Sequence, residues 1–359
     1  MVPAPIEQVP SMPKSARGIW PRIVEFPNIA AAWREARKGK RYYPEVLRFY
    51  GHLEENLLSI RAGLLNKTWY PSPWREFVVK EPKLRLVQAP AFVDRVVHHS
   101  LVRIIEPYFE RRFISDSYAC RKERGTHAAS NRLQEFLISV SALWNAPYAL
   151  KADIKSYFPN IRHKILLPQI ARTIGDKDAL WLCERIVTCN GFENSGLPIG
   201  ALTSQLFANV YLDTLDHFIK DDMGVRYYVR YMDDFIILGQ SKRDLHEILA
   251  RVHDFLGERL ELTLNPKTSI FPVSHGVDFS GYRHWTSHIL PRKRNTGRAR
   301  RQFRKMALNY ALGKIDLEYI RPRVASFCGQ MKHCDAYRTT ESVLSELVLS
   351  RPPQHESSK

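Results

Sequence analysis

Two adjacent carboxylates, Asp233 and Asp234, lie between two short runs of mostly β-forming residues, 227–230 and 235–238. Neighbouring Asp side chains repel each other and favour turns over strands, so this pattern predicts a hairpin with both acids at its tip. Such a turn gains little unless a divalent cation neutralises its charge. The pair therefore indicates a metal site, and a solvated Asp-Asp turn is the alternative.

A third carboxylate, Asp153, ends the run Tyr148–Asp153, which has the pattern of a buried strand. If this strand packs beside the predicted hairpin, three acids come together. Three such acids can hold two Mg²⁺ ions roughly 3.5–4 Å apart, the arrangement that stabilises the attacking and leaving oxygens in phosphoryl transfer. The sequence therefore predicts two-metal phosphoryl-transfer chemistry.

Several motifs, in chain order, resemble those of reverse transcriptases, and the match covers most of the chain. The palm motifs are Asp153 with Phe158, Gly-Leu-Pro-Ile-Gly at 196–200, and Tyr-Met-Asp-Asp at 231–234. Further blocks are similar to the fingers and template-facing motifs of the bacterial branch, group II intron-like, that includes diversity-generating retroelements and phage-defence relatives: 81–85, 94–99, 117–121 and 125–127. The Ser-Gln pair at 204–205, where many relatives carry Ser-Pro, is similar to the diversity-generating group.

The resemblance implies an α+β fold of the right-hand polymerase type, with fingers, an antiparallel palm sheet and a helical thumb. It implies an RNA-directed DNA polymerase that adds deoxynucleotides to a primer 3′ end. Two Mg²⁺ ions, with Mn²⁺ as an alternative, would be held by Asp153, Asp233 and Asp234, and the carbonyl of Ile154 would complete the shell. Lys267 is the candidate proton donor to the leaving pyrophosphate, and a surface lysine beside a proline turn is the alternative.

Residues in three motifs are candidates for binding the incoming nucleotide. Phe158 would crowd the 2′ position of the sugar and favour deoxynucleotides, with Tyr157 beside it, and core packing is the alternative for both rings. Ile199 stands where several relatives carry a Gln that hydrogen-bonds the nucleotide, so we expect low fidelity. Gly200 permits close approach of the backbone, and Gln205 follows in the same motif.

Two cations, Lys83 and Arg85, alternate with leucines in a predicted hairpin and therefore share one strand face. The resemblance places the incoming triphosphate at this face, and Arg binds phosphate bidentately. A solvated strand face is the alternative.

Template and primer candidates are basic or glycine-containing segments. Arg121 and Arg124 could grip template phosphates from a loop rich in small and basic residues, with solvated charge as the alternative. The predicted hairpin at 279–282 resembles a primer grip. Downstream, Arg292–Lys305 holds eight Lys or Arg in fourteen residues, which predicts a cationic thumb helix that follows the duplex by its phosphates. The full set is Arg121, Arg124, Tyr231, Met232, Gly281, Tyr282, Arg294, Arg298, Arg301 and Lys305.

Composition supports a polyanionic partner. The 359 residues are 44% hydrophobic, as in globular proteins, and 54 Lys+Arg against 37 Asp+Glu give a net charge of +17. The expected partners are a structured non-coding RNA template, a DNA or RNA primer, dNTPs and a small accessory protein, with no membrane. The five cysteines form no CxxC pair, so we expect free thiols in a soluble, cytoplasmic protein.

Five segments are expected along the chain, with part of 160–195 returning to the fingers as an open alternative. They are a Pro-rich arm at 1–28, fingers at 29–145, palm at 146–284, basic helical thumb at 285–350 and polar tail at 351–359. Apolar spacing predicts helices at 30–38, 43–65, 94–108, 201–220 and 242–259, and a strand at 260–269.

Three biological roles remain open. The first is an error-prone enzyme of a diversity-generating retroelement, dedicated to one structured RNA. The second is an antiphage defence enzyme that copies a non-coding RNA or synthesises DNA with little template. The third is a catalytically idle RNA-binding scaffold, against which three mutually repelling acids argue, because a non-catalytic palm has no reason to keep them.

Overall fold

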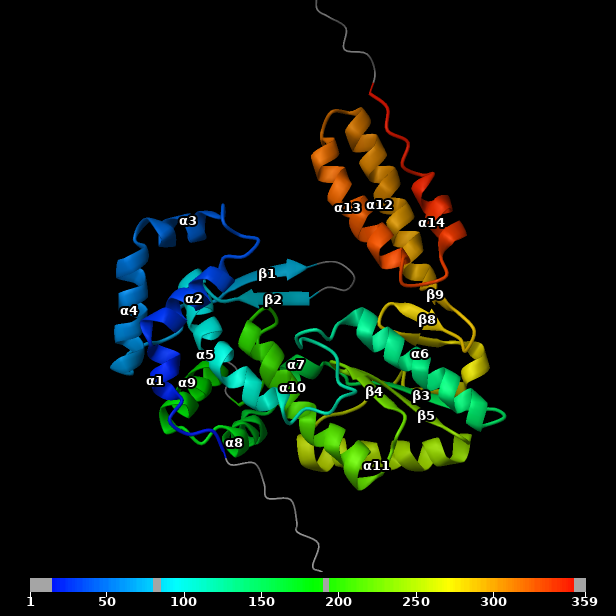
Figure 1. Cartoon of the computed structure of the whole chain (residues 1–359), viewed down its shortest axis with the longest axis horizontal. Coiled ribbons are helices and arrows are strands. Elements are labelled where there is room, and N and C mark those ends of the chain that lie inside the picture. Colours follow the sequence, from blue (N-terminus) through cyan, green and yellow to red (C-terminus); the bar gives the residue numbers. More distant parts are fainter. Residues whose placement is uncertain (1–14, 80–84, 190–193, 352–359) are drawn as a thin grey trace, which may run out of the picture. The chain divides into compact units, whose positions relative to one another are not determined.

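The described part of the chain forms two compact units, each assembled from three separate stretches of sequence. The computed structural model describes residues 15–79, 85–189 and 194–351 (Figure 1). The first unit comprises Met1–Ile114, Lys155–Phe218 and Asp254–Thr263, and the second comprises Ser115–Ile154, Ile219–His253 and Leu264–Lys359.

The first unit is built mainly of helices packed around α5. Val96, Val97, Leu101 and Ile105 of α5 are fully buried, and α2 packs along this helix. The antiparallel pair β1–β2 confirms the predicted hairpin. The elements are α1 (Trp20–Val24), α2 (Phe26–Ala36), α3 (Pro44–Gly51), α4 (Leu53–Leu65), β1 (Arg75–Val79), β2 (Arg85–Ala89), α5 (Phe92–Glu110), α7 (Tyr157–Asn160), α8 (His163–Thr173), α9 (Lys177–Thr188) and α10 (Leu202–His217).

The predicted N-terminal arm is wrong from Trp20 onward, because α1 and the start of α2 occupy this segment. Each of these helices has a proline in its first turn, where the missing N–H costs nothing. Asp176 Oδ2 accepts hydrogen bonds from Ile19 N (2.8 Å) and Trp20 N (3.0 Å), which satisfies the start of α1. The prolines therefore mark helix starts. Residues 1–14 of the predicted arm lie outside the described residues.

A four-stranded antiparallel sheet forms the centre of the second unit, in the order β4-β5-β3-β6. Its strands are β3 (Tyr148–Asp153), β4 (Tyr228–Tyr231), β5 (Asp234–Gly239) and β6 (Ser269–Pro272). Helix α6 (Thr126–Leu143) packs on β4 and β5, and its Leu133, Leu137 and Val140 share a core with Val229 and Ile236 of these strands (Figure 1). The strands predicted around the three acids are confirmed.

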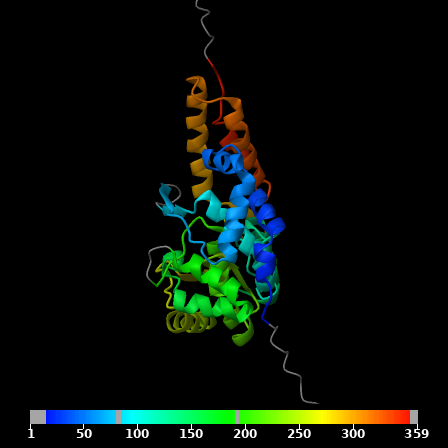
Figure 2. The same cartoon turned by 90° about the vertical axis from the view of Figure 1, so that its left-hand side faces the viewer.

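Beyond this sheet, the second unit contains a small three-stranded sheet and three helices. The strands are β7 (Val277–Phe279), β8 (Tyr282–His284) and β9 (Ile289–Pro291), after the short helix η2 (Val273–His275); the helices are α12 (Lys293–Ala311), α13 (Leu317–Met331) and α14 (Tyr337–Leu344). Figures 1 and 2 both show α12 and α13 side by side. Phe303, Phe327 and Val343 belong to a core that these helices form among themselves.

Two sequence predictions miss the observed boundaries. The segment predicted as a strand at 260–269 lacks strand structure over most of its length, apart from an isolated bridge at Leu264, and β6 begins only at Ser269. A tight turn at Pro266 and Lys267 precedes β6, and Asn265 Oδ1 accepts from Lys267 N (3.1 Å) there. The helix predicted at 43–65 is interrupted at His52, whose φ of −128° is not helical. Helix α10 gives way to a π-helical turn, η1 (Phe218–Asp222), and α11 covers Lys242–Leu260.

All five cysteines are free, as expected. None of the helices within the described ranges is both long enough and apolar enough to cross a membrane.

Candidate active site

A two-residue turn between β4 and β5 carries Asp233, and the first residue of β5 is Asp234. Tyr231 pairs with Asp234 at the end of the ladder, which leaves Met232 and Asp233 at the tip. Met232 has a φ of 57°, and this left-handed conformation costs a residue with a side chain on the order of 1 kcal/mol or more. The predicted hairpin is confirmed, and its tip is a strained turn.

A buried arginine and the end of β3 brace this turn. Arg230 is fully buried, and its Nη1 donates to Met232 O (2.9 Å). Ile154 N donates to Asp233 O (3.2 Å). Because both tip carbonyls accept hydrogen bonds from neighbouring structure, the turn is held from both sides and its strain can persist.

The register of β3 against β5 sets Asp153 directly opposite Asp234. Cross-strand partners share one face of a sheet, with Cβ atoms about 4.5–5.5 Å apart, and like charges so placed destabilise the pair. Asp153 Oδ2 accepts a hydrogen bond from Asn265 Nδ2 (3.0 Å), which fixes one of its oxygens. The three predicted acids are therefore brought to one end of one sheet.

The surroundings of Asp234 disfavour the ionised form of its carboxyl group. Burial raises the pKa of Asp234 to about 6, and the charges of Asp153 and Asp233 push in the same direction, against Lys151 and Arg292. Its Oδ1 is buried and has no hydrogen-bond partner among the described residues. Such a group needs a compensating charge.

The donor set at this sheet end fits a divalent cation of the Mg²⁺ type. Carboxylate oxygens are the ligands that Mg²⁺ prefers, and the unpartnered, buried Oδ1 of Asp234 is the kind of atom that an ion satisfies. In the part of the chain that the structure describes, no three His, Cys, Asp or Glu side chains are already gathered around one metal position. The carbonyl of Ile154 as a further ligand stays a prediction, as does Lys267, which is exposed in the turn after Asn265.

The β7–β8 hairpin forms as predicted, with Ser280 and Gly281 in its turn. Tyr282 is fully buried, and its hydroxyl donates to Gln330 O (3.0 Å) in α13. This geometry favours a role for Tyr282 in holding α13, and leaves the partly exposed Gly281 as the member of the pair that a primer could approach. Primer contact by either residue stays a prediction.

The loop before α6 uses its arginines internally. Arg121 is buried and its Nη1 donates to Ser117 O (2.7 Å), while Arg124 Nη1 donates to Ser115 O. The Arg124 guanidinium also lies 5.7 Å from the centre of the Tyr118 ring. These contacts argue for loop bracing, above all by Arg121, and template binding by the two arginines stays a prediction.

In the first unit, the nucleotide-binding candidates gather around Gly200. The φ of Gly200 is 132°, and a Cβ there would lie 3.1 Å from Val87 Cγ1 and 3.2 Å from Gln88 O, so only glycine fits against β2. Ile199 O accepts from Gln88 N (3.1 Å), and Phe158 O accepts from Leu197 N (2.9 Å) just upstream. The backbone therefore joins the β2, Phe158 and Ile199–Gly200 motifs.

The side chains of these candidates differ in exposure. Phe158 and Ile199 are partly exposed and Gln205 is exposed, whereas Tyr157 is buried and its hydroxyl donates to Ala208 O. Tyr157 thus has the core environment given above as its alternative. Lys83 lies outside the described residues, and for Arg85 only the backbone of β2 is described.

Helix α12 carries its positive charges on two faces. Arg300 donates to Ser342 Oγ (2.8 Å) in α14, and Arg304 forms two hydrogen bonds (2.7 and 2.9 Å) to Glu346, two residues after the end of α14. The predicted binding residues recur every three or four positions on another face, at Arg294, Arg298, Arg301 and Lys305. Helix formation over this segment confirms the spacing on which that prediction rests.

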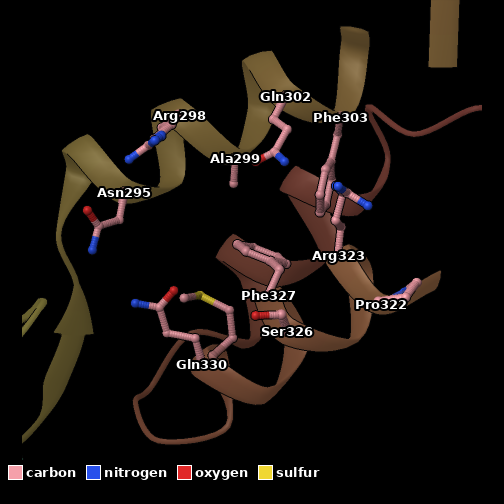
Figure 3. Close-up of a pocket in the computed structure, with 11 residues that line it drawn as sticks. Asn295, Arg298, Ala299, Gln302, Phe303, Pro322, Arg323, Ser326, Phe327 and Gln330 are labelled. Carbon is pink, nitrogen blue, oxygen red and sulfur yellow. The ribbon is translucent and has the colours of Figure 1, made fainter. Parts of the chain in front are cut away.

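A groove of ≈ 630 Å³ lies between α12 and α13. Amide and guanidinium groups of Asn295, Arg298 and Gln302 enter it from α12, and Gln330 enters it from α13 (Figure 3). Phe303, Phe327 and Met331 also line it. The groove therefore combines polar donors with an apolar lining beside the cationic face.

Four residues near the acids were not singled out from the sequence: Lys151, Arg230, Asn265 and Arg292. Strand alternation could have found Lys151, since it lies two residues before Asp153 and hence on the same face. Arg230, between apolar residues of a buried strand, was visible as an anomaly. Asn265 and Arg292 reach the site through tertiary contacts that no local pattern contains.

Comparison with known proteins agrees with this geometry. Residues 78–284, more than half of the chain, match the family described as "Reverse transcriptase (RNA-dependent DNA polymerase)". The chain belongs to this reverse transcriptase family. The expected right-hand polymerase fold, with its antiparallel palm sheet, and the expected enzyme class are thereby confirmed.

Similar proteins include Protein YkfC of Escherichia coli (strain K12), which is 25% identical over 64% of this chain and 71% of its own length. The group II intron-encoded protein LtrA of Lactococcus lactis subsp. cremoris is 29% identical over 74% of this chain. The chain spans 54% of the length of LtrA. Among solved structures, apo telomerase from Candida Tropicalis aligns over 78% of this chain and 63% of its own chain, with 11% identity and a TM-score of 0.49.

Proposed function

We propose that the chain extends a primer 3′ end with deoxynucleotides on an RNA template by phosphoryl transfer. The observation that carries this proposal is the register that sets Asp153 opposite Asp234, beside Asp233 at the hairpin tip, in a chain of the reverse transcriptase family. These three acids would hold two Mg²⁺ ions, with Mn²⁺ as an alternative. The ions would stabilise charge on the attacking and leaving oxygens. The braced turn would keep the acids in place.

Primer extension on a primed RNA template tests this proposal directly. We expect Mg²⁺-dependent dNTP incorporation by the native chain and a loss on the order of a thousandfold in Asp233→Asn, because a metal ligand is removed without a change in shape. Asp244→Asn, at an exposed position in the first turn of α11, is the matched control and should retain activity. Equal activity of the native chain and Asp233→Asn would refute the proposal.

Sugar choice and fidelity are assigned to Phe158 and Ile199. The partial exposure of both side chains and the tie of their backbones to one glycine motif support this assignment. Phe158→Ala should incorporate ribonucleotides that the native chain rejects. Ile199→Gln should lower the error rate, by up to about tenfold for a restored hydrogen bond of roughly 0.5–1.5 kcal/mol. An unchanged error spectrum in sequenced products would count against the role of Ile199.

Duplex binding is assigned to the face of α12 that carries Arg294, Arg298, Arg301 and Lys305, together with Gly281 in the β7–β8 turn. Arg301→Gln with Lys305→Gln should reduce the salt dependence of RNA–DNA duplex binding by about two counterions. Arg304→Gln is the matched control, because Arg304 is paired with Glu346 and should leave this slope unchanged. Equal slopes in the double variant and the native chain would refute this assignment.

For the biological role, we favour an error-prone enzyme dedicated to the structured RNA of a diversity-generating retroelement. The Ser-Gln pair at 204–205 and the aliphatic Ile199 support this choice. A defence enzyme that copies a non-coding RNA is the alternative. The net charge of +17 supports an RNA partner, and five free thiols support a cytoplasmic setting. Sequencing the RNA that co-purifies with the chain, and the DNA made from it, decides between the two roles. Frequent errors in copies of a repeat support the first role, and faithful copies of one RNA support the second.

A further inference from the structure

Lys151 lies beside the candidate metal site, on the same face of β3 as Asp153. Its position in the middle of the strand pairs it with Ile236 of β5, two positions along the ladder from the Asp153–Asp234 pair. Its Nζ lies 3.8 Å from Asp234 Oδ2 and donates a 2.7 Å hydrogen bond to Asp278 O in β7. The ammonium therefore contacts both the catalytic sheet and the β7–β8 hairpin.

The charges around this ammonium form a short chain. Asp278 Oδ1 lies 3.8 Å from Arg292 Nε, at the start of α12. Two cations, Lys151 and Arg292, thus act on the three carboxylates at the sheet end. Within the described residues, Lys151 is the one of these two that lies within ion-pair distance of a candidate metal ligand. A cation so close to a carboxylate reduces the negative potential that the acids present to a divalent ion.

The orientation of the Asp234 carboxylate also depends on Lys151. Asp234 uses one oxygen toward the ammonium, and its other oxygen is buried without a partner among the described residues. The hydrogen bond from Lys151 to Asp278 O ties the same ammonium to a second sheet, so its location is set by two contacts rather than one. Asp234 is in this way oriented by a group that is itself fixed.

We propose that Lys151 is a positioning residue that orients Asp234 and, as a built-in counter-cation, sets how tightly the three acids bind a divalent ion. The inference rests on the proposed function, because it concerns the same carboxylates. It predicts two separable effects of losing the ammonium. The acids gain net negative charge and bind ions more tightly, while Asp234 is less well oriented and chemistry slows.

Binding of Mn²⁺ alone, followed by electron paramagnetic resonance without primer or nucleotide, gives a readout that does not depend on activity. Lys151→Gln removes the charge but retains a side-chain donor, and Lys151→Arg retains the charge. We expect Lys151→Gln to lower the Mn²⁺ dissociation constant several-fold and to lower kcat for primer extension with little change in the KM for dNTP. Lys151→Arg should restore both quantities toward native values.

Two controls separate this role from general damage. Lys242→Met removes an exposed lysine at the start of α11 in the same unit and should change neither quantity. Thermal unfolding in the presence of a chelator shows whether each variant folds, and Lys151→Met is the second variant if Lys151→Gln does not. Unchanged or weaker Mn²⁺ binding in the folded variant would overturn the role of Lys151.

The failure of the proposed function has a different signature. If the native chain does not bind Mn²⁺, or if Asp153→Asn binds Mn²⁺ as tightly as the native chain does, both the metal site and the inference are overturned. If Asp153→Asn removes Mn²⁺ binding but Lys151→Gln leaves its dissociation constant unchanged, the site stands and only the inference falls.

Discussion

The second unit contains two hairpins with two-residue turns that solve the same geometric problem in different ways. In the β7–β8 turn both central residues, Ser280 and Gly281, have positive φ (47° and 91°). This conformation matches the twist of the strands; glycine adopts it without strain, whereas Ser280 bears the same kind of cost as Met232. In the β4–β5 turn a methionine, Met232, has the positive φ, and a carboxylate follows it.

The contacts that support the two turns also differ. The β7–β8 turn is supported from the start of α12, where Asn295 Nδ2 donates to Gly281 O (3.2 Å). The β4–β5 turn needs the buried guanidinium of Arg230, and it lies beside an acid whose pKa is raised. The β7–β8 turn has a glycine at one of its two left-handed positions. The β4–β5 turn has none at its left-handed position and is held in place against strain and repulsion. Strain and repulsion held in this way are typical of sites that serve chemistry.

Asp234→Asn should have the largest effect on the difference between the two turns, because it removes the negative charge beside the β4–β5 turn and keeps the shape of the turn. We expect activity to fall on the order of a thousandfold. At neutral pH the free energy of unfolding should rise by about 1–3 kcal/mol, because burial and like charges disfavour the ionised form of Asp234, whose pKa is raised to about 6. Primer extension and urea unfolding in the presence of a chelator measure the two effects. A variant that is both inactive and less stable would contradict the idea that function costs stability here.

Arg230→Met tests the brace of the β4–β5 turn. Loss of the guanidinium leaves the carbonyl of Met232 without this donor, and we expect the free energy of unfolding to fall by about 3 kcal/mol, together with activity. Urea unfolding gives the first value. Arg226→Met, an arginine whose side chain is exposed just before β4, is the control and should lie within about 0.5 kcal/mol of the native chain. Similar losses in both variants would remove Arg230 from its special role.

Sequence reasoning recovers the elements of this unit better than their supports. Runs of β-forming residues predict β3, β4 and β5 and place Asp153 at a strand end and Asp233 and Asp234 at a hairpin tip, because these signals are local in sequence. The braces of Arg230 and Asn265 and the ammonium of Lys151 depend on contacts between elements far apart in sequence. The strand predicted at 260–269 fails for the opposite reason: the local turn chemistry of Asn265 and Pro266 outweighs β propensity.

Helix α12 shows the same limit. Helical spacing predicts α12 and its basic face, but all eight basic residues look alike in the sequence. Only the fold distinguishes Arg300 and Arg304, which bond to α14 and to Glu346 just after it, from Arg301 and Lys305 on another face. Charge counting therefore identifies a basic helix, and tertiary structure decides which charges nucleic acid can use.

Acid should weaken the support of the β7–β8 hairpin. His284 in β8 is fully buried, and burial lowers its pKa to about 4, so the folded chain holds it neutral while the unfolded chain protonates it near pH 6.5. Its contribution is present above pH 6.5 and is lost as pH falls from 6.5 to about 4, up to roughly 3 kcal/mol. Urea unfolding between pH 8 and 4.5 should show a shallower pH dependence for His284→Gln. The difference between the two curves is the relevant quantity, since His98 has a pKa lowered to about 3 by burial and adds a slope of the same sign to both.

Gly281→Ala tests whether the β7–β8 turn needs its glycine, and we expect it to have the smallest effect of these variants on the free energy of unfolding. A Cβ at Gly281 would meet only ordinary contacts, 3.7 Å from Asn295 Nδ2 and from Gln330 Nε2, so the cost is the strain of a φ of 91°, about 1–2 kcal/mol. Gly297→Ala is the matched control: Gly297 lies within α12, a Cβ there would make only an ordinary contact with Arg301 Nη1 at 3.9 Å, and alanine should stabilise the chain by about 0.5–1 kcal/mol. Opposite signs of the two changes in urea unfolding would show that the β7–β8 turn requires glycine for its backbone. Equal signs would mean that the turn relaxes, and that its stability does not come from its own sequence.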